Sequence, residues 1–289
     1  MVKKIKKLKK FSIVDVGIPL FNESKNIEKT LKSLKNQTFK NTRFIILNNS
    51  STDNTYHICK KIIKNDKRFH IFQNKKKMSS FSNFNKVFKK SNSKYFFWNS
   101  GHDLRSKNFI KDSIVYMENN KDVGLCFSNF FVNSKINLKL INVDNEKKNR
   151  NFFSILKYFS NIKFNYQVYG VFRSSILSKT SLFRNVVGGD EILVKEVAFL
   201  SNIKKITGNS YTNLYINNYG SWKDYLKKHL LINKSNIPKT IIFFPFLKNC
   251  QLFFQYEKNI IKFFFYVINE LCKTLQKCFY YYKELLIKI

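Results

Sequence analysis

Short apolar runs alternate with amphipathic segments through the first hundred residues, and this alternation restricts the fold more than any other feature. The runs have the length of strands and lie at residues 12–20, 43–50, 68–72 and 95–100. After the first run, Ile27, Leu31 and Leu34 recur at three- and four-residue steps, as on the buried face of a helix. Repeated strand–loop–helix units predict an α/β domain whose mostly parallel, Rossmann-like sheet is flanked by helices.

Polar residues follow three of these predicted strands. They begin after Leu20, at Asn48 and at Ser100. The carboxyl ends of parallel strands lie at one edge of a sheet, and ligands of doubly wound sheets bind outside that edge. We therefore expect the three strand ends to converge on one crevice.

Further elements are predicted beyond residue 120. Residues 122–132 have the pattern of a long strand or a strand pair, and residues 166–177 that of a strand running into a helix. Residues 186–202 hold a glycine pair, an acidic pair and an amphipathic helix, so the acids lie at the helix N-terminus. Residues 133–165 are rich in Asn and Lys, and we expect a variable loop there.

The C-terminal region differs in composition from the rest of the chain. From about residue 222 Lys, Phe, Tyr, Ile and Leu dominate, and apolar residues between Ile261 and Ile289 recur at helical steps. This pattern predicts a long basic amphipathic helix that packs on the domain or on a second copy of the chain in an oligomer, or else lies on a membrane interface. We therefore divide the chain into an α/β domain at 1–215 and a helical region at 216–289.

The chain is strongly basic. Lys and Arg number 53 against 18 Asp and Glu, a formal net charge of +35, which is typical of proteins that bind nucleic acid or anionic membranes. The excess is almost all Lys and occurs with abundant Asn, Ile and Phe, a composition expected of an AT-rich coding sequence. Zinc-finger spacing, RNA-binding aromatic motifs and a P-loop are absent from the sequence, so we expect no nucleic-acid partner and keep an anionic membrane surface as the alternative.

Cysteine spacing and hydropathy bear on the compartment. The five cysteines lack the spacing of a zinc site or a disulfide framework, which fits a reducing cytosol. The basic N-terminal segment lacks the apolar core of a signal peptide, and no run reaches the roughly 18–20 apolar residues of a membrane-spanning helix. We expect a cytoplasmic protein, either soluble or peripheral at the cytoplasmic face of the membrane.

Five motifs occur in a fixed order along this framework. They are VDVGIPLFNES from residue 14, FIILNNSSTDNT from 44, NFNKVFKKSNSKYFFWNSGHDL from 83, YGVFR from 169 and GGDEILVKEVAFLSNI from 188. In order and spacing they resemble the family 2 glycosyltransferases of the GT-A class, over about residues 12–210. The resemblance implies an enzyme that moves a sugar, with inversion, from a nucleoside diphosphate sugar to a hydroxyl of a glycan or lipid-linked acceptor. It also implies a setting in surface-polysaccharide assembly.

The resemblance further implies a set of residues that bind the nucleotide sugar. This donor set is Pro19, Phe21, Asn22, Glu23, Asn48, Ser50, Asp53, Asn85, His102 and Arg173. The family often has two acids after the second strand, where this chain has Asn48 and Asn49. An amide still donates and accepts hydrogen bonds but is not a charged acceptor, so the identity of the base stays open.

Some members of the donor set have structural alternatives. Pro19 is expected to stop the first strand, because proline lacks a backbone N–H. Glu23 favours a helix N-terminus and Asp53 is a good helix cap, so both residues have a structural role as an alternative to ligand contact. Arg173 faces the diphosphate or else pairs with an acid.

The metal motif of the family, an acid, any residue and a further acid, falls on the stretch from Ser100 to Asp103. His102 and Asp103 remain as ligands for a divalent cation, Mn²⁺ or Mg²⁺, which neutralises a diphosphate leaving group. Imidazole favours Mn²⁺ of the two. The alternative is a polar loop in which Asp103 caps the next helix.

Asp190 and Glu191 match the acidic pair that supplies the general base in inverting members of the family. We expect Asp190 to take the proton of the acceptor hydroxyl, and Gly188 and Gly189 to let the backbone approach the substrate closely. The alternative is that the two acids only complement the dipole of their helix.

Two other classes of function stay open. The loss of acids at positions 48, 100 and 102 also fits a catalytically silent GT-A-like protein that binds a nucleotide or a glycan. The basic segment 222–289 fits a peripheral membrane adaptor. Donor turnover with Mn²⁺ distinguishes an enzyme from the first, and vesicle binding with and without the segment tests the second.

Overall fold

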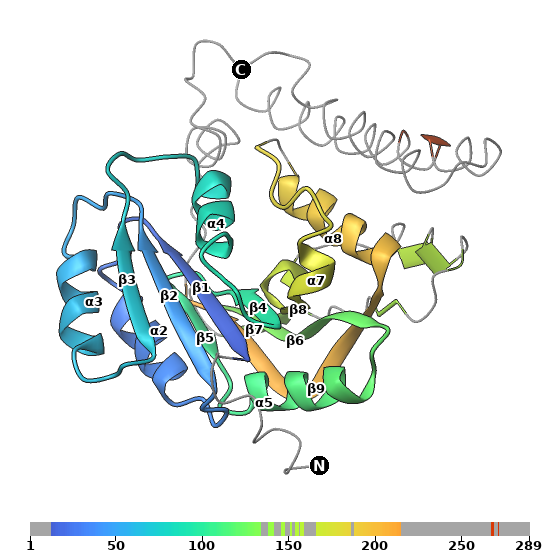
Figure 1. The fold of residues 1–289 in the computed structure, drawn as a ribbon, viewed down its shortest axis with the longest axis horizontal. Helices are drawn as coiled ribbons and strands as arrows, with labels where there is room; N and C mark the ends of the chain where they lie inside the picture. Colours follow the sequence, from blue (N-terminus) through green and yellow to red (C-terminus); the bar gives the residue numbers. More distant parts are fainter. Residues whose placement is uncertain are drawn as a thin grey trace.

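The computed structural model contains a nine-stranded sheet with helices on both faces (Figure 1). The strands are β1 (Val14–Leu20), β2 (Thr42–Asn48), β3 (Phe69–Gln73), β4 (Tyr95–Trp98), β5 (Asp103–Arg105), β6 (Val123–Asn133), β7 (Leu138–Ile141), β8 (Val171–Arg173) and β9 (Asn202–Asn213). Their order is β3-β2-β1-β4-β8-β6-β9-β5, and β7 pairs with β6 outside this path. The structure describes residues 13–133, 138–141, 146–147, 151, 154–155, 157–158, 166–185, 188–214, 267–268 and 271.

The N-terminal half of the sheet is parallel, as the strand–helix repeats predict. β1 pairs with β2 and with β4, and β2 pairs with β3, all in parallel. In this register Leu20 lies beside Asn48, and Asn48 lies beside Gln73. Gly17 of β1 lies beside Trp98, the last residue of β4, so the ends of β1, β2 and β4 point to one edge, as expected for Leu20, Asn48 and Ser100.

The other half of the sheet is mixed. β8 joins β4 and β6 in antiparallel fashion, β6 and β9 are parallel, and β5 closes the far edge antiparallel to β9. The segment at 122–132 is thus a single long strand, β6. β5 is the outer strand of the mixed half, and it begins at Asp103, directly after the loop that follows β4. The outer edge of the mixed half therefore lies next to that loop.

Six helices cover the two faces of the sheet in the described part of the chain. They are α2 (Ile27–Lys35), α3 (Thr55–Ile63), α4 (Ser80–Phe88), α5 (Phe109–Asn119), α7 (Ser174–Leu177) and α8 (Gly189–Leu200), and a short 3₁₀ helix, η1, spans Tyr166–Tyr169. Residues of α2, α3 and α5 share one buried cluster, and residues of α4, α7 and α8 share the other. In Figure 1 α4, α7 and α8 lie above the strands and α5 lies below them.

Strand β2 shows how the sequence builds both clusters at once. Its side chains alternate between faces, so Phe44 and Ile46 enter the cluster of α2 and α3 while Ile45 and Leu47 enter the cluster of α4. A strand buried on both faces reads as a continuous apolar run, which is the pattern seen at residues 43–48.

Pro19 lies within β1 rather than ending it, which corrects the expectation from the sequence. Its partner in β2 is Leu47, and the strand continues to Leu20. Gly17 O accepts the N–H of Asn99, on the β4 side, and Leu20 O accepts the N–H of Asn49, on the β2 side. Backbone groups alternate in direction, so position 19 faces the β4 side, beyond the last paired residue of β4, and the missing N–H of proline breaks no ladder hydrogen bond.

Several predictions concern residues outside the described part of the chain. The division at 215/216 and all of the expected helix from 261 to 289 except residues 267–268 and 271 lie there, as does most of the variable region at 133–165. Among the described residues, no helix combines the length and the apolar character that crossing a membrane requires.

Candidate functional site

The loops after β1 and β2 are joined by hydrogen bonds that involve side chains. Thr52 donates its backbone N–H to Asn22 Oδ1 at 2.9 Å, and Glu23 donates its backbone N–H to Thr55 Oγ1 at 2.7 Å. Asn22 has a left-handed backbone with φ of 54°, which Asn tolerates better than most residues. The two strand ends therefore meet, and Asn22 holds one loop on the other.

Asp53 fastens the same junction. Its Oδ2 accepts the backbone N–H of Ser24 and its Oδ1 accepts that of Thr55, both at 3.0 Å. Burial alone would raise the pKa of Asp53, but the hydrogen bonds from Thr55 and Ser24 outweigh burial and lower this pKa. Asp53 thus accepts the N–H of Thr55, the first residue of α3, and holds the β1 loop, while the N-cap of the helix is Asn54 rather than Asp53.

Asn48 ends β2 with its amide in a defined orientation. Its Oδ1 accepts a hydrogen bond from Ser51 Oγ at 2.5 Å and from the Ser51 backbone N–H at 3.4 Å. Ser51 Oγ in turn accepts the N–H of Asn22 at 3.0 Å, so its single proton goes to Asn48. Asn48 Nδ2 is buried without a hydrogen-bond partner. An unpaired buried donor costs about 1–3 kcal/mol, which an acceptor atom on a ligand would recover.

Asn49 and Ser50 are directed toward the loop after β3. Asn49 Oδ1 accepts from Asn74 Nδ2 and from the Met78 backbone N–H, both at 3.0 Å, and its Nδ2 donates to Met78 O at 2.8 Å. Ser50 Oγ donates to Asn74 O at 2.7 Å. These contacts hold the segment between β3 and α4 against the end of β2, so the side chains of both residues serve the scaffold of the site.

Phe21, directly after β1, carries a lysine over its ring. Lys77 Nζ lies 4.0 Å from the centre of the Phe21 ring, and the Lys77 side chain is exposed. Such a cation–π contact stabilises by about 0.5–1 kcal/mol at an exposed site. It places a positive charge beside the strand end, the sign that a diphosphate requires. In a sequence this rich in lysine, nothing distinguishes Lys77 from its neighbours.

Hydrogen bonds from buried polar groups stabilise the turn from Ser100 to Asp103. Asp103 Oδ2 accepts the backbone N–H of Ser100 at 2.9 Å, and Asn99 Nδ2 donates to Asp103 O at 3.2 Å. Arg105 Nε donates to Asn99 Oδ1 at 2.7 Å, and its guanidinium lies 4.3 Å from the Tyr211 ring centre. Burial lowers the pKa of Arg105, while Tyr211 and Asp103 oppose that change. Asp103 lies in β5, ahead of α5, so the expectation that it might instead cap a helix is wrong.

Glu23, His102 and Asp103 form a line of contacts that joins the loops after β1 and β4. His102 Nδ1 lies 2.9 Å from Glu23 Oε1, and His102 Nε2 lies 4.0 Å from Asp103 Oδ1. The Asp103 side chain is fully buried, and its Oδ1 has no hydrogen-bond partner. A distance of 4.0 Å is too long for a hydrogen bond between this oxygen and the ring nitrogen. It is short enough for one ion or water molecule between them to contact both atoms.

The line offers two candidate ligands rather than a closed cage. Within the described part of the chain, no cluster of three or more His, Cys, Asp or Glu side chains has an arrangement that could hold a metal ion. Glu23 contacts Nδ1 of the His102 ring, and Nε2 on the other side of the ring lies toward Asp103 Oδ1. A cation at this place would need further ligands from a substrate or from water.

Gly101 is required by the close approach of the β1 loop. A Cβ atom at this position would lie 2.6 Å from Glu23 Cγ and 2.7 Å from Leu20 Cδ2, closer than real contacts allow. Thr30, on α2, donates its hydroxyl to Gly101 O at 2.9 Å and fixes the turn from the other side. The spacing between Glu23 and His102 therefore depends on a glycine at 101.

Asn85, on α4, uses its amide within the protein. Its Nδ2 donates to Phe183 O at 2.8 Å, and its Oδ1 accepts the Phe183 N–H at 3.0 Å. The same segment is tied to α8, because Glu196 accepts hydrogen bonds from the Ser181 N–H and hydroxyl, both at 2.7 Å. Asn85 therefore holds the segment that precedes α8, in place of the donor contact expected from the sequence.

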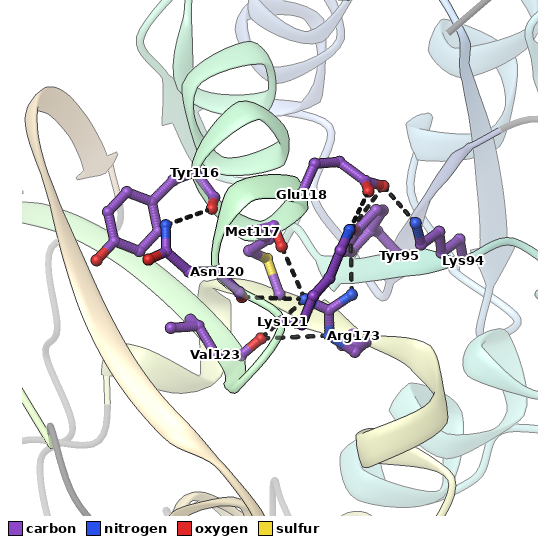
Figure 2. Close-up of polar contacts among 9 residues, drawn as sticks. All are labelled: Lys94, Tyr95, Tyr116, Met117, Glu118, Asn120, Lys121, Val123 and Arg173. Atoms are coloured by element: carbon purple, nitrogen blue, oxygen red, sulfur yellow. Dashed lines mark hydrogen bonds and ion pairs between the residues drawn. The ribbon is translucent and has the colours of Figure 1, made fainter. Parts of the chain in front are cut away.

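Arg173 lies at the opposite edge of the sheet, which corrects its assignment to the diphosphate. Its guanidinium donates to Met117 O at 2.9 Å, to Val123 O at 3.2 Å and to Asn120 O at 3.4 Å, beside the C-terminal end of α5 (Figure 2). It also donates to Tyr95 Oη at 3.2 Å, and Tyr95 is the first residue of β4. A cation is favoured here because the last carbonyls of a helix lack partners within the helix.

Asp190 and Glu191 open α8 with different partners. Glu191 Oε1 pairs with the fully buried Lys195 Nζ at 2.9 Å. Asp190 Oδ1 accepts the Glu191 backbone N–H at 3.0 Å. Burial raises the pKa of Tyr166, and the charge of Asp190 adds to that rise, so Asp190 lies within electrostatic range of Tyr166. Glu191 is thus committed to a buried cation, and Asp190 is the better candidate for a base.

The local backbone geometry explains why glycine occupies both positions before these acids. Gly188 is left-handed, with φ of 72°, and forms the N-cap of α8. A Cβ atom on Gly189 would lie 2.2 Å from Arg184 O, so this residue accommodates the preceding loop. The close backbone approach expected at Gly189 is therefore to the protein itself.

Aromatic rings connect the two acidic positions. The pKa of Tyr211 is raised by burial and then by the charge of Asp103. The ring centres of Tyr211 and Phe130 lie 4.5 Å apart, and those of Phe130 and Tyr166 lie 3.5 Å apart. Because the charge of Asp190 also raises the pKa of Tyr166, Asp103 and Asp190 each lie within electrostatic range of one of these aromatic rings.

A half-parallel, half-mixed sheet with polar strand ends at one edge is the architecture of the GT-A class of glycosyltransferases. The chain belongs to glycosyl transferase family 2, because the model of that family matches residues 15–180, more than half of the chain. It is also 29% identical over 111 residues to an uncharacterised glycosyltransferase of Haemophilus influenzae. That match covers 38% of this chain and 34% of the relative, so the chain spans about a third of the relative's length.

Solved structures show the same fold at low sequence identity. The 1–349 portion of S. aureus TarS, in complex with UDP-GlcNAc, superposes with a TM-score of 0.68 at 13% identity, over 89% of this chain and 71% of that one. The mannosyltransferase PcManGT of Pyrobaculum calidifontis, in complex with GDP-Man and Mn²⁺, gives a TM-score of 0.56 at 12% identity, over 92% and 88%. Identity this low supports the fold alone.

Proposed function

We propose that the chain is an inverting glycosyltransferase that moves a sugar from a nucleoside diphosphate sugar to a hydroxyl of a glycan or lipid-linked acceptor. The observation that carries this proposal is the line from Glu23 through His102 to the buried, unpaired Asp103 oxygen, at the strand ends where doubly wound sheets bind ligands. Membership of family 2 supports sugar transfer. Complexes of structural neighbours with UDP-GlcNAc and GDP-Man support a nucleotide-sugar donor.

The nucleotide is assigned to the ends of β1 and β2. Asn48 Nδ2 is a buried donor without an acceptor, so we assign it to an acceptor atom of the bound nucleotide. Phe21 offers a ring face, and Lys77 offers a charge at its edge of the site. A supporting role is assigned to Asn22, Ser50 and Asp53, because their side chains form hydrogen bonds with the loops that carry these groups.

A divalent cation fits the pair formed by His102 Nε2 and Asp103 Oδ1. The fit rests on the unpaired, fully buried Asp103 oxygen and on the presence of one nitrogen and one oxygen donor. A divalent ion bound there, Mn²⁺ in preference to Mg²⁺, would neutralise charge on the diphosphate leaving group. The Mn²⁺ complex of one structural neighbour is consistent with this assignment.

Asp190 is assigned as the general base. It takes the proton from the acceptor hydroxyl as that oxygen attacks the anomeric carbon from the side opposite the nucleotide. The new glycosidic bond forms while the bond from the anomeric carbon to the diphosphate oxygen breaks, and the nucleoside diphosphate leaves with that electron pair. Tyr166, which stacks on Phe130 and lies within electrostatic range of Asp190, offers an aromatic surface that suits a sugar ring.

We place the enzyme in surface-polysaccharide assembly at the cytoplasmic face of the membrane. The high net positive charge supports a contact with anionic lipid. Vesicle co-sedimentation at low and high salt tests this placement, because a surface held by charge is released by salt.

Turnover of donor tests the proposed activity. With Mn²⁺ present, the full chain should hydrolyse or transfer from at least one of UDP-, GDP- and CDP-sugars. Asp103→Ala and Asp190→Ala should each lower that rate by two or more orders of magnitude, as loss of a charge-stabilising or acid–base group does. Nucleotide binding without turnover in the wild type would instead indicate a catalytically silent binding protein.

A further inference from the structure

We propose that Glu23 is a positioning residue that fixes the hydrogen of the His102 ring on Nδ1, so that Nε2 and Asp103 Oδ1 form the cation-binding pair. The inference rests on the proposed function only in connecting that cation with a diphosphate. It gives Glu23 a role different from the nucleoside contact expected from its place after β1.

The hydrogen position follows from the partner of Nδ1. His102 Nδ1 lies 2.9 Å from Glu23 Oε1, and an ionised carboxylate has only acceptor atoms. Nδ1 must therefore be the donor. In the neutral ring Nε2 then carries a lone pair, which is the form of imidazole that binds metal ions.

The second half of the pair is the Asp103 carboxylate. Its Oδ2 is satisfied by the Ser100 N–H at 2.9 Å, which leaves Oδ1 as the acceptor without a hydrogen-bond partner, in a side chain that is fully buried. A buried carboxylate oxygen is costly unless it meets a donor or a cation. The separation of 4.0 Å from His102 Nε2 is less than twice a bond of about 2.1 Å, so both atoms can reach one ion.

The Glu23 carboxylate is held in place independently of any ligand. Its backbone N–H donates to Thr55 Oγ1 at 2.7 Å, and its carbonyl accepts the N–H groups of Asn26 and Ile27. The side chain packs on Gly101, where there is no room for a Cβ atom. A preformed carboxylate–histidine arrangement of this kind raises the basicity of the ligating nitrogen and fixes its direction.

Cation binding by the full chain, without donor, tests the inference directly. After chelator treatment, Mn²⁺ is titrated and its free fraction is followed by electron paramagnetic resonance. We expect His102→Ala and Asp103→Ala to lose binding, and Glu23→Ala to weaken it about 10–100-fold, the usual effect of removing such a partner. Glu23→Gln keeps an acceptor and should lose less. Glu28→Gln, which changes an exposed acid on α2 that pairs with Lys32, is the matched control and should bind as the wild type does.

The ring tautomer gives a readout that a merely structural role would not move. In the metal-free chain, ¹⁵N spectra of the histidine side chains should show the Nδ1–H form at His102, assigned from a His102→Asn variant. Glu23→Ala should shift His102 toward the Nε2–H form while the signals of His57 and His70 stay unchanged. If Glu23→Ala does not fold, as judged by circular dichroism, Glu23→Met, which has a similar length and no carboxylate, carries the same comparison in both measurements.

The outcomes separate this inference from the proposed function. Unchanged Mn²⁺ affinity and an unchanged His102 spectrum in the Glu23 variants would overturn the positioning role, and so would a wild type that binds no Mn²⁺. Mn²⁺ binding that depends on Glu23, in a chain that neither binds UDP nor turns over any donor, would support the inference while the proposed sugar transfer fails.

Discussion

Replacing Gly101 by alanine tests the geometry of the site at its tightest point. The new Cβ atom would meet Glu23 Cγ at 2.6 Å, and ordinary contact begins at 3.4 Å, so the Glu23 side chain must retreat by about 0.8 Å. If Glu23 Oε1 moves away from His102 Nδ1 by the same amount, the distance between these atoms would rise from 2.9 Å to about 3.7 Å, beyond hydrogen-bond range. The variant should therefore lose the Glu23–His102 contact without any change to the two side chains.

Two measurements follow this substitution. Overpacking of this kind costs about 1–3 kcal/mol of unfolding free energy, measurable by urea denaturation, and Mn²⁺ affinity should fall about 10–100-fold. Gly208→Ala is the control, because Gly208 has φ of 75° and open space around it, so alanine there strains only the backbone. A Gly101→Ala chain with wild-type stability and Mn²⁺ affinity would refute the placement of Glu23 against the turn.

Three further substitutions test other parts of the account. Asn48→Asp turns a buried donor into an acceptor, so calorimetry with UDP, CDP and GDP should give a changed order of affinity; an unchanged order contradicts the role of Nδ2. Asn85→Ala should lower the unfolding free energy by about 1–3 kcal/mol in urea with UDP affinity unchanged, because both amide groups bind Phe183; weaker UDP binding in the folded variant would restore its donor role. At Glu118, burial is outweighed by hydrogen bonds from Lys121, Lys94 and Tyr95, which lower the pKa to about 2 (Figure 2). Its stabilisation should be present above pH 4.5 and be lost as pH falls toward 2, and Glu118→Gln should flatten that part of the stability profile and cost about 1 kcal/mol at pH 7.

The parallel half of the fold could be predicted because each strand and helix carries a local pattern. Ile27, Leu31 and Leu34 recur at helical spacing and are all fully buried on α2. The strand ends could be aligned because parallel strands have one direction, which placed Leu20 and Asn48 side by side.

The mixed half is harder to predict because its strands lack such a pattern. β9 contains two lysines and three asparagines, and its pairing with β6 and β5 makes it a strand. β5 has three residues, too few for any periodicity. Pairing between distant segments, rather than local propensity, determines both strands.

Side-chain partners within the site depend on the same long-range pairing. Glu23 and His102 are separated by 79 residues, and nothing local to either predicts their contact. Arg173 follows an apolar run as a ligand residue would, but β8 runs antiparallel to β4 and carries it to the opposite edge. A residue at the end of a strand can be assigned to an edge of the sheet only when the direction of that strand is known.

A crystal of the full chain grown with UDP and Mn²⁺, with anomalous data collected at the manganese edge, tests the central claim most directly. We expect a manganese peak in contact with His102 Nε2 and Asp103 Oδ1, with Glu23 on the far side of the ring. We also expect the diphosphate between the end of β2 and Asp190. A manganese peak bound elsewhere, or a UDP molecule bound away from these strand ends, would contradict it.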